Sequence, residues 1–214
     1  MVRLEHRDAT IELDSYTTSA NLRELWQAVE SIRSQVPLKT QHCRGCGVCC
    51  GDLIPVLGLD FDLFRNQLGF ENLIMPPAPD LELRARAVRD MSRNMNIPEA
   101  ESAVLYEFNQ ADPVTTVRHD DGTCVFLDNR ICTVYESRFF VCRLYVCTMG
   151  TRLSTLQENI VTQGTWHAYS RLGWVPEEQI AHNPFAGAAT YDDVDLGAFE
   201  ALGPKSPQEL FFFF

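Results

Sequence analysis

Four cysteines stand within eight residues of this chain, and few folds need so many thiols so close together for packing alone. The stretch reads Cys43-Arg44-Gly45-Cys46-Gly47-Val48-Cys49-Cys50. Core cysteines would recur at the period of a helix or a strand, and Arg44, Gly45 and Gly47 fit neither pattern. Glycines permit a turn whose backbone N–H groups approach negatively charged sulfur. The stretch therefore predicts a loop that ligates metal.

Disulfide bonds are the main alternative, because eight cysteines is an even number. The chain opens Met1-Val2-Arg3-Leu4-Glu5-His6-Arg7-Asp8, without the apolar segment or small-residue cleavage site of a secretory signal. We therefore expect a cytoplasmic protein with reduced thiols. A length of 214 residues also allows a hydrophobic core that needs no covalent staples. A further alternative, thiol-based redox sensing, would need an exposed cysteine of low pKa that no metal holds.

The other four cysteines form a second cluster, and the 73 residues between Cys50 and Cys124 contain none. Its members are Cys124, Cys132, Cys142 and Cys147. The first two flank a predicted hairpin with strands at 124–127 and 131–135 around Asp128-Asn129-Arg130. The sequence from residue 124 to residue 152 contains four arginines and only two acidic residues. This positive balance lies where thiolates would need it.

Arginines next to the cysteines are the expected charge partners of the sulfurs. Arg44, Arg138 and Arg143 could donate N–H groups to thiolates. The alternative for Arg138 and Arg143 is an ion pair with Glu136 or Asp128. His42, one residue before the loop, is a lesser ligand candidate, because imidazole beside a tight set of thiols is usually spare.

Hydrophobic periodicity places these motifs in an α+β fold, mainly helical with a small antiparallel β-hairpin and a cysteine-rich metal centre. The pattern predicts helices over residues 19–36, 60–68, 81–95, 98–108 and 153–172, and short strands at 2–14, 53–57 and 115–119. Trp26 fits a core position better than a cofactor contact, and His167 fits a core or surface histidine better than a metal ligand. Arg84, Arg86, Arg89 and Arg93 fit a solvated helix face.

Composition divides the chain into two parts and excludes some partners. We expect a metal-binding domain over 1–172, with its core at 43–147, and an acidic extension over 173–214. The net charge of -11 argues against nucleic acid, and no apolar run approaches the length of a membrane span. The chain ends in Phe211, Phe212, Phe213 and Phe214, which we expect to pack on the domain or on a protein partner.

The arrangement of the cysteines resembles the YkgJ-type cysteine-cluster family, assigned to zinc or iron chelation and related to a domain of flagellin lysine N-methylases. The resemblance covers roughly Cys43 to Cys147, through the four-thiol loop, a later Cys-x-x-Tyr and a final Cys-Arg. It implies supporting roles for Tyr135, Arg138 and Arg143. It implies that the metal ligands are Cys43, Cys46, Cys49, Cys50, Cys124, Cys132, Cys142 and Cys147. One departure is Phe139, where the family usually has proline after the arginine.

Two metals and two classes of function stay open from the sequence. The triplet Cys43, Cys46 and Cys49 has the spacing that grips a 4Fe-4S iron-sulfur cluster, whereas eight thiols could also make two tetrahedral zinc sites. One class of function is an electron-transfer or binding module of a larger complex. The other is a cluster-dependent enzyme such as a protein methyltransferase, although the chain has no Gly-x-Gly-x-x-Gly fingerprint, P-loop or nucleophile elbow.

Overall fold

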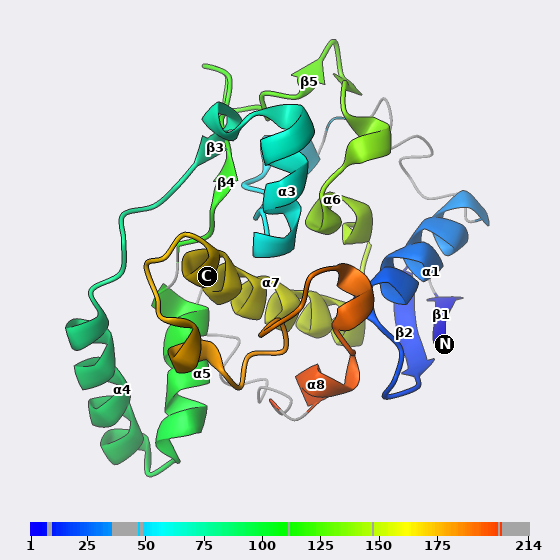
Figure 1. Cartoon of the computed structure of the whole chain (residues 1–214). Helices are drawn as coiled ribbons and strands as arrows, with labels where there is room; N and C mark the ends of the chain where they lie inside the picture. The colour runs from blue at the N-terminus through cyan, green and yellow to red at the C-terminus, as the bar shows by residue number, and fades with distance from the viewer. Residues whose placement is uncertain are drawn as a thin grey trace.

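The computed structural model describes residues 1–7, 10–35, 47, 49–110, 112–146, 148–200 and 202. These residues form an α+β structure, mainly helical with small two-stranded antiparallel sheets (Figure 1). Its helices and strands, in chain order, are β1 (Val2–Arg7), β2 (Thr10–Tyr16), α1 (Leu22–Gln35), α3 (Phe61–Leu63), β3 (Leu73–Ile74), α4 (Leu81–Met95), α5 (Glu99–Gln110), β4 (Thr115–Thr116), β5 (Leu127–Asp128), β6 (Ile131–Cys132), α6 (Phe140–Leu144), α7 (Thr151–Arg171) and α8 (Gly197–Glu200).

Helix α7 runs through the middle of the molecule (Figure 1). β2, α5, α8 and the helical turn 58–60 all pack against it. Its buried side chains are Leu153, Leu156, Gln157, Asn159, Ile160, Thr162, Gln163, Thr165, Trp166, His167, Ala168 and Tyr169. A helix that is buried on most sides carries no single apolar stripe, so polar side chains share its buried surface with apolar ones.

The contact between α7 and turn 58–60 uses glycine on both sides. A Cβ on Gly58 would lie 2.6 Å from His167 Nδ1 and 3.1 Å from the backbone N and Cα of Ala168. A Cβ on Gly164 would lie 2.7 Å from Cδ2 of Leu57. Of the core and surface positions considered for His167, the structure shows the core position: the side chain is buried and stacks on Phe185, although its Nδ1 has no hydrogen-bond partner among the described residues.

We expect Gly58→Ala to lower the free energy of unfolding by about 1–3 kcal/mol, because the added methyl group meets helix backbone and a stacked imidazole that have no room to move. Urea unfolding followed by circular dichroism measures the change. Gly51→Ala is the matched control, since nothing lies within 4 Å of its Cβ position, and it should unfold within about 0.5 kcal/mol of the wild type. Equal losses in both variants would contradict the close contact.

The sheets are less extensive than the sequence predicts in two places and more extensive in one. The first residues form a complete hairpin, in which β1 pairs with β2, rather than one edge strand. The expected strand at 53–57 is wrong, since its ladder contact is an isolated bridge from Pro55 to Thr115. The strand predicted at 115–119 shortens to β4, which pairs with β3. Proline removes a ladder donor, which is consistent with the weak pairing at Pro55.

The hairpin of β5 and β6 confirms the turn predicted between the second-cluster cysteines. Leu127 pairs with Cys132 and Asp128 with Ile131. Asn129 and Arg130 have φ values of 47° and 65°, and a two-residue hairpin loop of type I′ needs positive φ at both positions. Each strand is only two residues long, so this hairpin depends on the packing around it.

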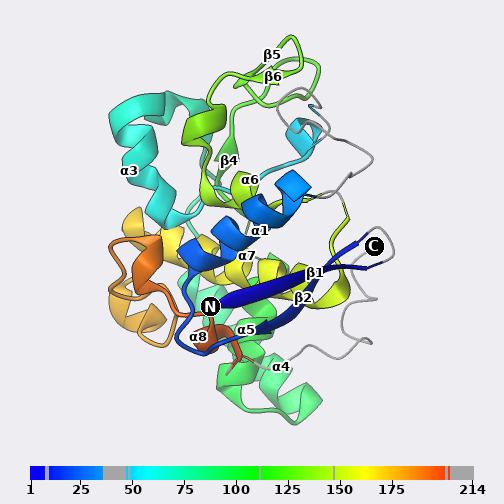
Figure 2. The ribbon, with the colours of Figure 1, turned by 90° about the vertical axis from the view of Figure 1, so that its right-hand side faces the viewer.

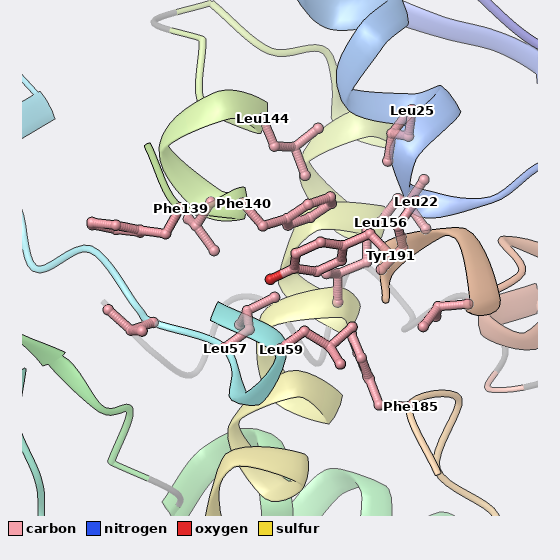
Figure 3. Close-up of a cluster of buried hydrophobic side chains, with 14 of the residues drawn as sticks. Leu22, Leu25, Leu57, Leu59, Phe139, Phe140, Leu144, Leu156, Phe185 and Tyr191 are labelled. Carbon is pink, nitrogen blue, oxygen red and sulfur yellow. The ribbon is translucent and has the colours of Figure 1, made fainter. Parts of the chain in front are cut away.

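The larger of the two apolar clusters in the described residues contains side chains from both early and late parts of the sequence. Figure 3 shows part of it, where Leu22 and Leu25 of α1 meet Phe140 of α6 and Leu156 of α7. Side chains from the predicted C-terminal segment also enter this core, namely Phe185, Tyr191, Val194, Leu196 and Phe199. The ring of Tyr191 stacks on Phe140 with centroids 4.6 Å apart. Trp26, predicted as a core residue, is partly buried against the same cluster.

Helices α4 and α5 form a hairpin at the end of the molecule away from β5 and β6 (Figures 1 and 2). The solvated face predicted for the arginines of α4 is confirmed for Arg86, Arg89 and Arg93, which are exposed, but is wrong for Arg84. The side chain of Arg84 is only 14% exposed and forms an ion pair with Glu107 of α5. None of the helices in the described ranges is long and apolar enough to span a membrane.

Candidate metal centre

The described cysteines come from four separate segments. Cys49 and Cys50 begin the helical turn 49–51, Cys132 ends β6 and Cys142 lies in α6. Cys124 precedes β5, and its backbone N–H donates to the carbonyl of Cys50 at 2.8 Å. Arg118 strengthens this junction by donating to the carbonyls of Cys50, at 2.7 Å, and Gly122, at 2.9 Å. The structure thus joins the two cysteine clusters of the sequence.

The thiols of these five cysteines are close enough to affect one another's protonation. Burial raises the pKa of Cys142 well above its usual value, and Cys49, Cys124 and Cys132 add to the rise. Burial also raises the pKa of Cys132, again with help from Cys124 and Cys49. A hydrogen bond between their side chains raises the pKa of Cys50 and lowers that of Cys49 to about 6. Crowded thiolates repel one another unless a cation lies among them.

None of these five described cysteines is in a disulfide. The remaining predicted site residues, Cys43, Cys46, Cys147, Arg44 and His42, lie outside the described residues. In the part of the chain that the structure describes, no three His, Cys, Asp or Glu side chains are grouped so that they could hold a metal ion. The described thiols therefore form a neighbourhood rather than a closed ligand set.

Arg138 is the cation that acts on most of these thiols. Its charge lowers the pKa of Cys49, Cys132 and Cys142. Its guanidinium carbon lies 3.8 Å from the centre of the Tyr135 ring, and its Nε donates to the Tyr135 carbonyl at 2.9 Å. Tyr135, predicted to support the site, thus holds Arg138 in place.

The alternative considered for Arg138 and Arg143 was an ion pair with Glu136 or Asp128, but both arginines pair with Glu30 of α1 instead. The distances to Glu30 Oε1 are 3.1 Å from Arg138 and 3.3 Å from Arg143. Arg143 also donates to the backbone carbonyls of Arg138 and Glu136. Glu30 precedes these arginines by more than 100 residues, and no local pattern in the sequence indicates the pairing.

Two further residues near the thiols were missed by the sequence analysis. The hydroxyl of Thr116 in β4 lies 3.4 Å from Cys124 Sγ, to which it can donate. Arg33 near the end of α1 lowers the pKa of Cys49 and donates to the carbonyls of Arg143, at 2.6 Å, and Tyr145, at 3.3 Å. The sequence places Arg33 near the end of a predicted helix, but it does not indicate that Arg33 lies beside Cys49 in the folded protein.

Asp60 positions the short helix that carries Cys142. Its carboxylate accepts hydrogen bonds from the backbone N–H of Phe140, at 3.2 Å, and of Leu57, at 3.3 Å. Phe140 is the first residue of α6, where a negative charge is favourable. Asp60 is only 4% exposed. Burial raises its pKa to about 6, while nearby Arg143 and Tyr191 act in the opposite direction.

The titration of Asp60 should be visible in the pH dependence of stability. The pKa of Asp60 in the folded protein lies above the ordinary value of 3.8. The contribution of Asp60 to the free energy of unfolding is therefore greatest at low pH and is lost as pH rises toward 6. We expect Asp60→Asn, which does not titrate, to gain about 2 kcal/mol in unfolding free energy relative to wild type between pH 4.5 and 7.5. Urea titrations of both proteins measure the difference. Parallel pH curves would contradict a raised pKa.

Comparison with known proteins places these residues in a family. No curated protein and no solved structure shows a significant match to the chain. The family model CxxCxxCC, described as "Putative zinc- or iron-chelating domain", matches residues 42–166, which include all eight cysteines and more than half of the sequence. The chain therefore belongs to the CxxCxxCC family of cysteine-cluster domains.

Proposed function

We propose that the protein is a metal-binding module whose two cysteine clusters hold one centre, with a 4Fe-4S iron-sulfur cluster as the first candidate and zinc as the second. The family description supports metal binding in general. The observation that carries the proposal is the junction of the two clusters, where the backbone N–H of Cys124 donates to the carbonyl of Cys50 at 2.8 Å. In support, Cys49, Cys124 and Cys132 add to the raised pKa of the buried Cys142. Thiolate sulfur is a soft ligand that suits both iron-sulfur clusters and zinc.

The chain's own residues would prepare the centre before any metal binds. Arg138 and Arg33 supply positive charge beside the thiols, and the Thr116 hydroxyl can donate to Cys124 Sγ. Such contacts hold thiolates in place and set how readily a bound centre gains or loses an electron. Cys43, Cys46 and Cys147 would complete the ligand set. An iron-sulfur cluster, when bound, would supply one-electron chemistry, and zinc would supply structural support.

This arrangement favours a role as an electron-transfer or binding module of a larger complex. The four terminal phenylalanines lie outside the described residues. Together with the acidic segment 173–214, they remain the predicted contact with a protein partner. A cluster-dependent enzyme is the second candidate. It is favoured by a cavity of about 240 Å³ lined by Arg138 and Arg143, because Arg138 also acts on the thiols.

Metal and acid-labile sulfide analysis of protein purified without oxygen tests the proposal, together with an absorption spectrum. Iron with stoichiometric sulfide and a broad band near roughly 400 nm would support the iron-sulfur cluster. Zinc without colour would support the second candidate. Protein that holds neither metal, and takes up neither after reconstitution with iron and sulfide or with zinc, would refute the proposal.

A further inference from the structure

A small open pocket with both polar and apolar walls lies between α1, α3, α6 and the helical turn 191–193. One of its residues, Arg138, also acts on the cysteine thiols. The volume of the pocket is about 240 Å³. This is below the roughly 300–1,000 Å³ of pockets for drug-sized ligands, so an occupant would be smaller. The residues that give its walls their chemistry are Trp26, Asp60, Gln67, Arg138, Arg143 and Tyr191.

One wall of the cavity carries a carboxylate and a phenol. The hydroxyl of Tyr191 makes no hydrogen bond of normal length and angle among the described residues, although the tyrosine is only 8% exposed. Figure 3 shows this hydroxyl pointing away from Leu22 and Leu156. Burial raises the pKa of Tyr191 well above its usual value, and the charge of Asp60 beside it and a contact of hydrogen-bond type with its carboxylate raise the pKa further. Buried polar groups nearly always have partners, so this wall suits a hydrogen-bond donor that also carries positive charge.

Another wall carries two guanidinium groups that share one carboxylate. Arg138 and Arg143 both pair with Glu30 Oε1, which leaves one positive charge in excess at this wall. Their side chains are 10% and 20% exposed, so water screens them only in part. Guanidinium groups bind carboxylates well because their N–H donors match the geometry of the two oxygens.

The geometry points to a binding site for a small zwitterion of amino-acid size, with its ammonium group at Asp60 and Tyr191 and its carboxylate at Arg138 and Arg143. The ring of Trp26 would bound the apolar part of the ligand beside Leu63 and Phe140, which also line the cavity. A molecule with only one of the two charges would meet one wall of opposite charge and one of like charge, and like charges repel. The site therefore selects for both charges together.

Binding can be tested by calorimetry with the full chain. Each of the twenty proteinogenic amino acids is first screened by thermal shift at 10 mM, and any that stabilises the protein is titrated. The hit is compared with the amine that lacks its carboxylate and with the acid that lacks its ammonium group. We expect a saturable hit, and at least about tenfold weaker binding of both analogues, since each loses a charge-assisted contact.

Variants connect the binding to this cavity. Asp60→Asn should lower the affinity for the zwitterion by about tenfold or more, and Tyr191→Phe should lower it by about threefold to tenfold. Tyr169→Phe is the matched control, because it removes the hydroxyl of another buried tyrosine, which donates to the Asp112 carbonyl; its affinity should not change. Circular dichroism melting confirms that each variant folds.

The inference fails if no amino acid binds saturably, or if a hit binds Tyr191→Phe and Asp60→Asn as tightly as the wild type. It also fails if the amine or the acid analogue binds as tightly as the zwitterion. The inference does not depend on the proposed metal, because calorimetry reports ligand binding and elemental analysis reports the metal separately.

Discussion

Removal of the metal by a chelator should lower the free energy of unfolding by about 4 kcal/mol when the free metal concentration had been 1,000 times its dissociation constant. The reason is that a bound metal would join four segments, at residues 49–50, 124, 132 and 142, that are otherwise connected by a backbone hydrogen bond and short strands. The measurement is urea unfolding followed by circular dichroism, under nitrogen, before and after treatment with EDTA or an iron chelator.

Two variants show whether the loss comes from the centre itself. Cys142→Ser removes a thiol whose pKa responds to three other cysteines; it should lose metal, and the chelator should then have no further effect. Gly58→Ala lowers stability through the contact with α7 instead. This variant should therefore keep its metal, and chelation should lower its free energy of unfolding by about 4 kcal/mol, as in the wild type. Identical unfolding curves of the wild type with and without chelator would contradict the proposed centre.

Local sequence signals predicted the long helices well. Helix α4 spans Leu81–Met95, as expected, because Asp80 caps its first turn by accepting from the backbone N–H of Leu83, and Asn96 ends it in a left-handed conformation. The helix predicted at 60–68 is instead a series of short helical turns, but it ends as expected before Gly69, whose φ is 79°. Helix α6 was missed, since five residues carry too little periodicity.

Contacts between distant residues were beyond the reach of these signals. The spacing of the cysteines predicted that the two clusters would share one ligand set. Among the described residues, a backbone hydrogen bond links Cys124 to Cys50, but no three thiols are grouped as metal ligands. The sequence did not predict that Glu30 would pair with Arg138 and Arg143, because that pairing depends on how α1 packs against α6. Nor did the acidic composition of segment 173–214 indicate that Tyr191 would stack on Phe140 in the core. Such contacts arise from the tertiary fold rather than from local propensity.

Apart from the contacts of the cysteines, the ion pair between Arg84 and Glu107 should be the contact whose disruption lowers the free energy of unfolding most. Both side chains are nearly buried, at 14% and 11% exposure, and burial raises the pKa of Glu107 although Arg84 opposes the rise. The guanidinium carbon of Arg84 also lies 4.4 Å from the centre of the Trp166 ring on α7. The pair therefore joins the hairpin of α4 and α5 to the central helix.

We expect Glu107→Gln to lower the free energy of unfolding by about 3 kcal/mol, because it leaves the buried charge of Arg84 without a counter-charge. Replacing both partners, as Arg84→Met with Glu107→Leu, should cost less than Glu107→Gln alone, since no buried charge then remains. Glu82→Gln is the matched control: its pair with Arg86, at 3.9 Å, is exposed on both sides, and its loss should change stability by less than about 0.5 kcal/mol. Urea unfolding of the wild type and the three variants distinguishes these cases. A double variant less stable than Glu107→Gln would contradict the prediction, because it would mean that the attraction within the pair exceeds the cost of burying its two charges.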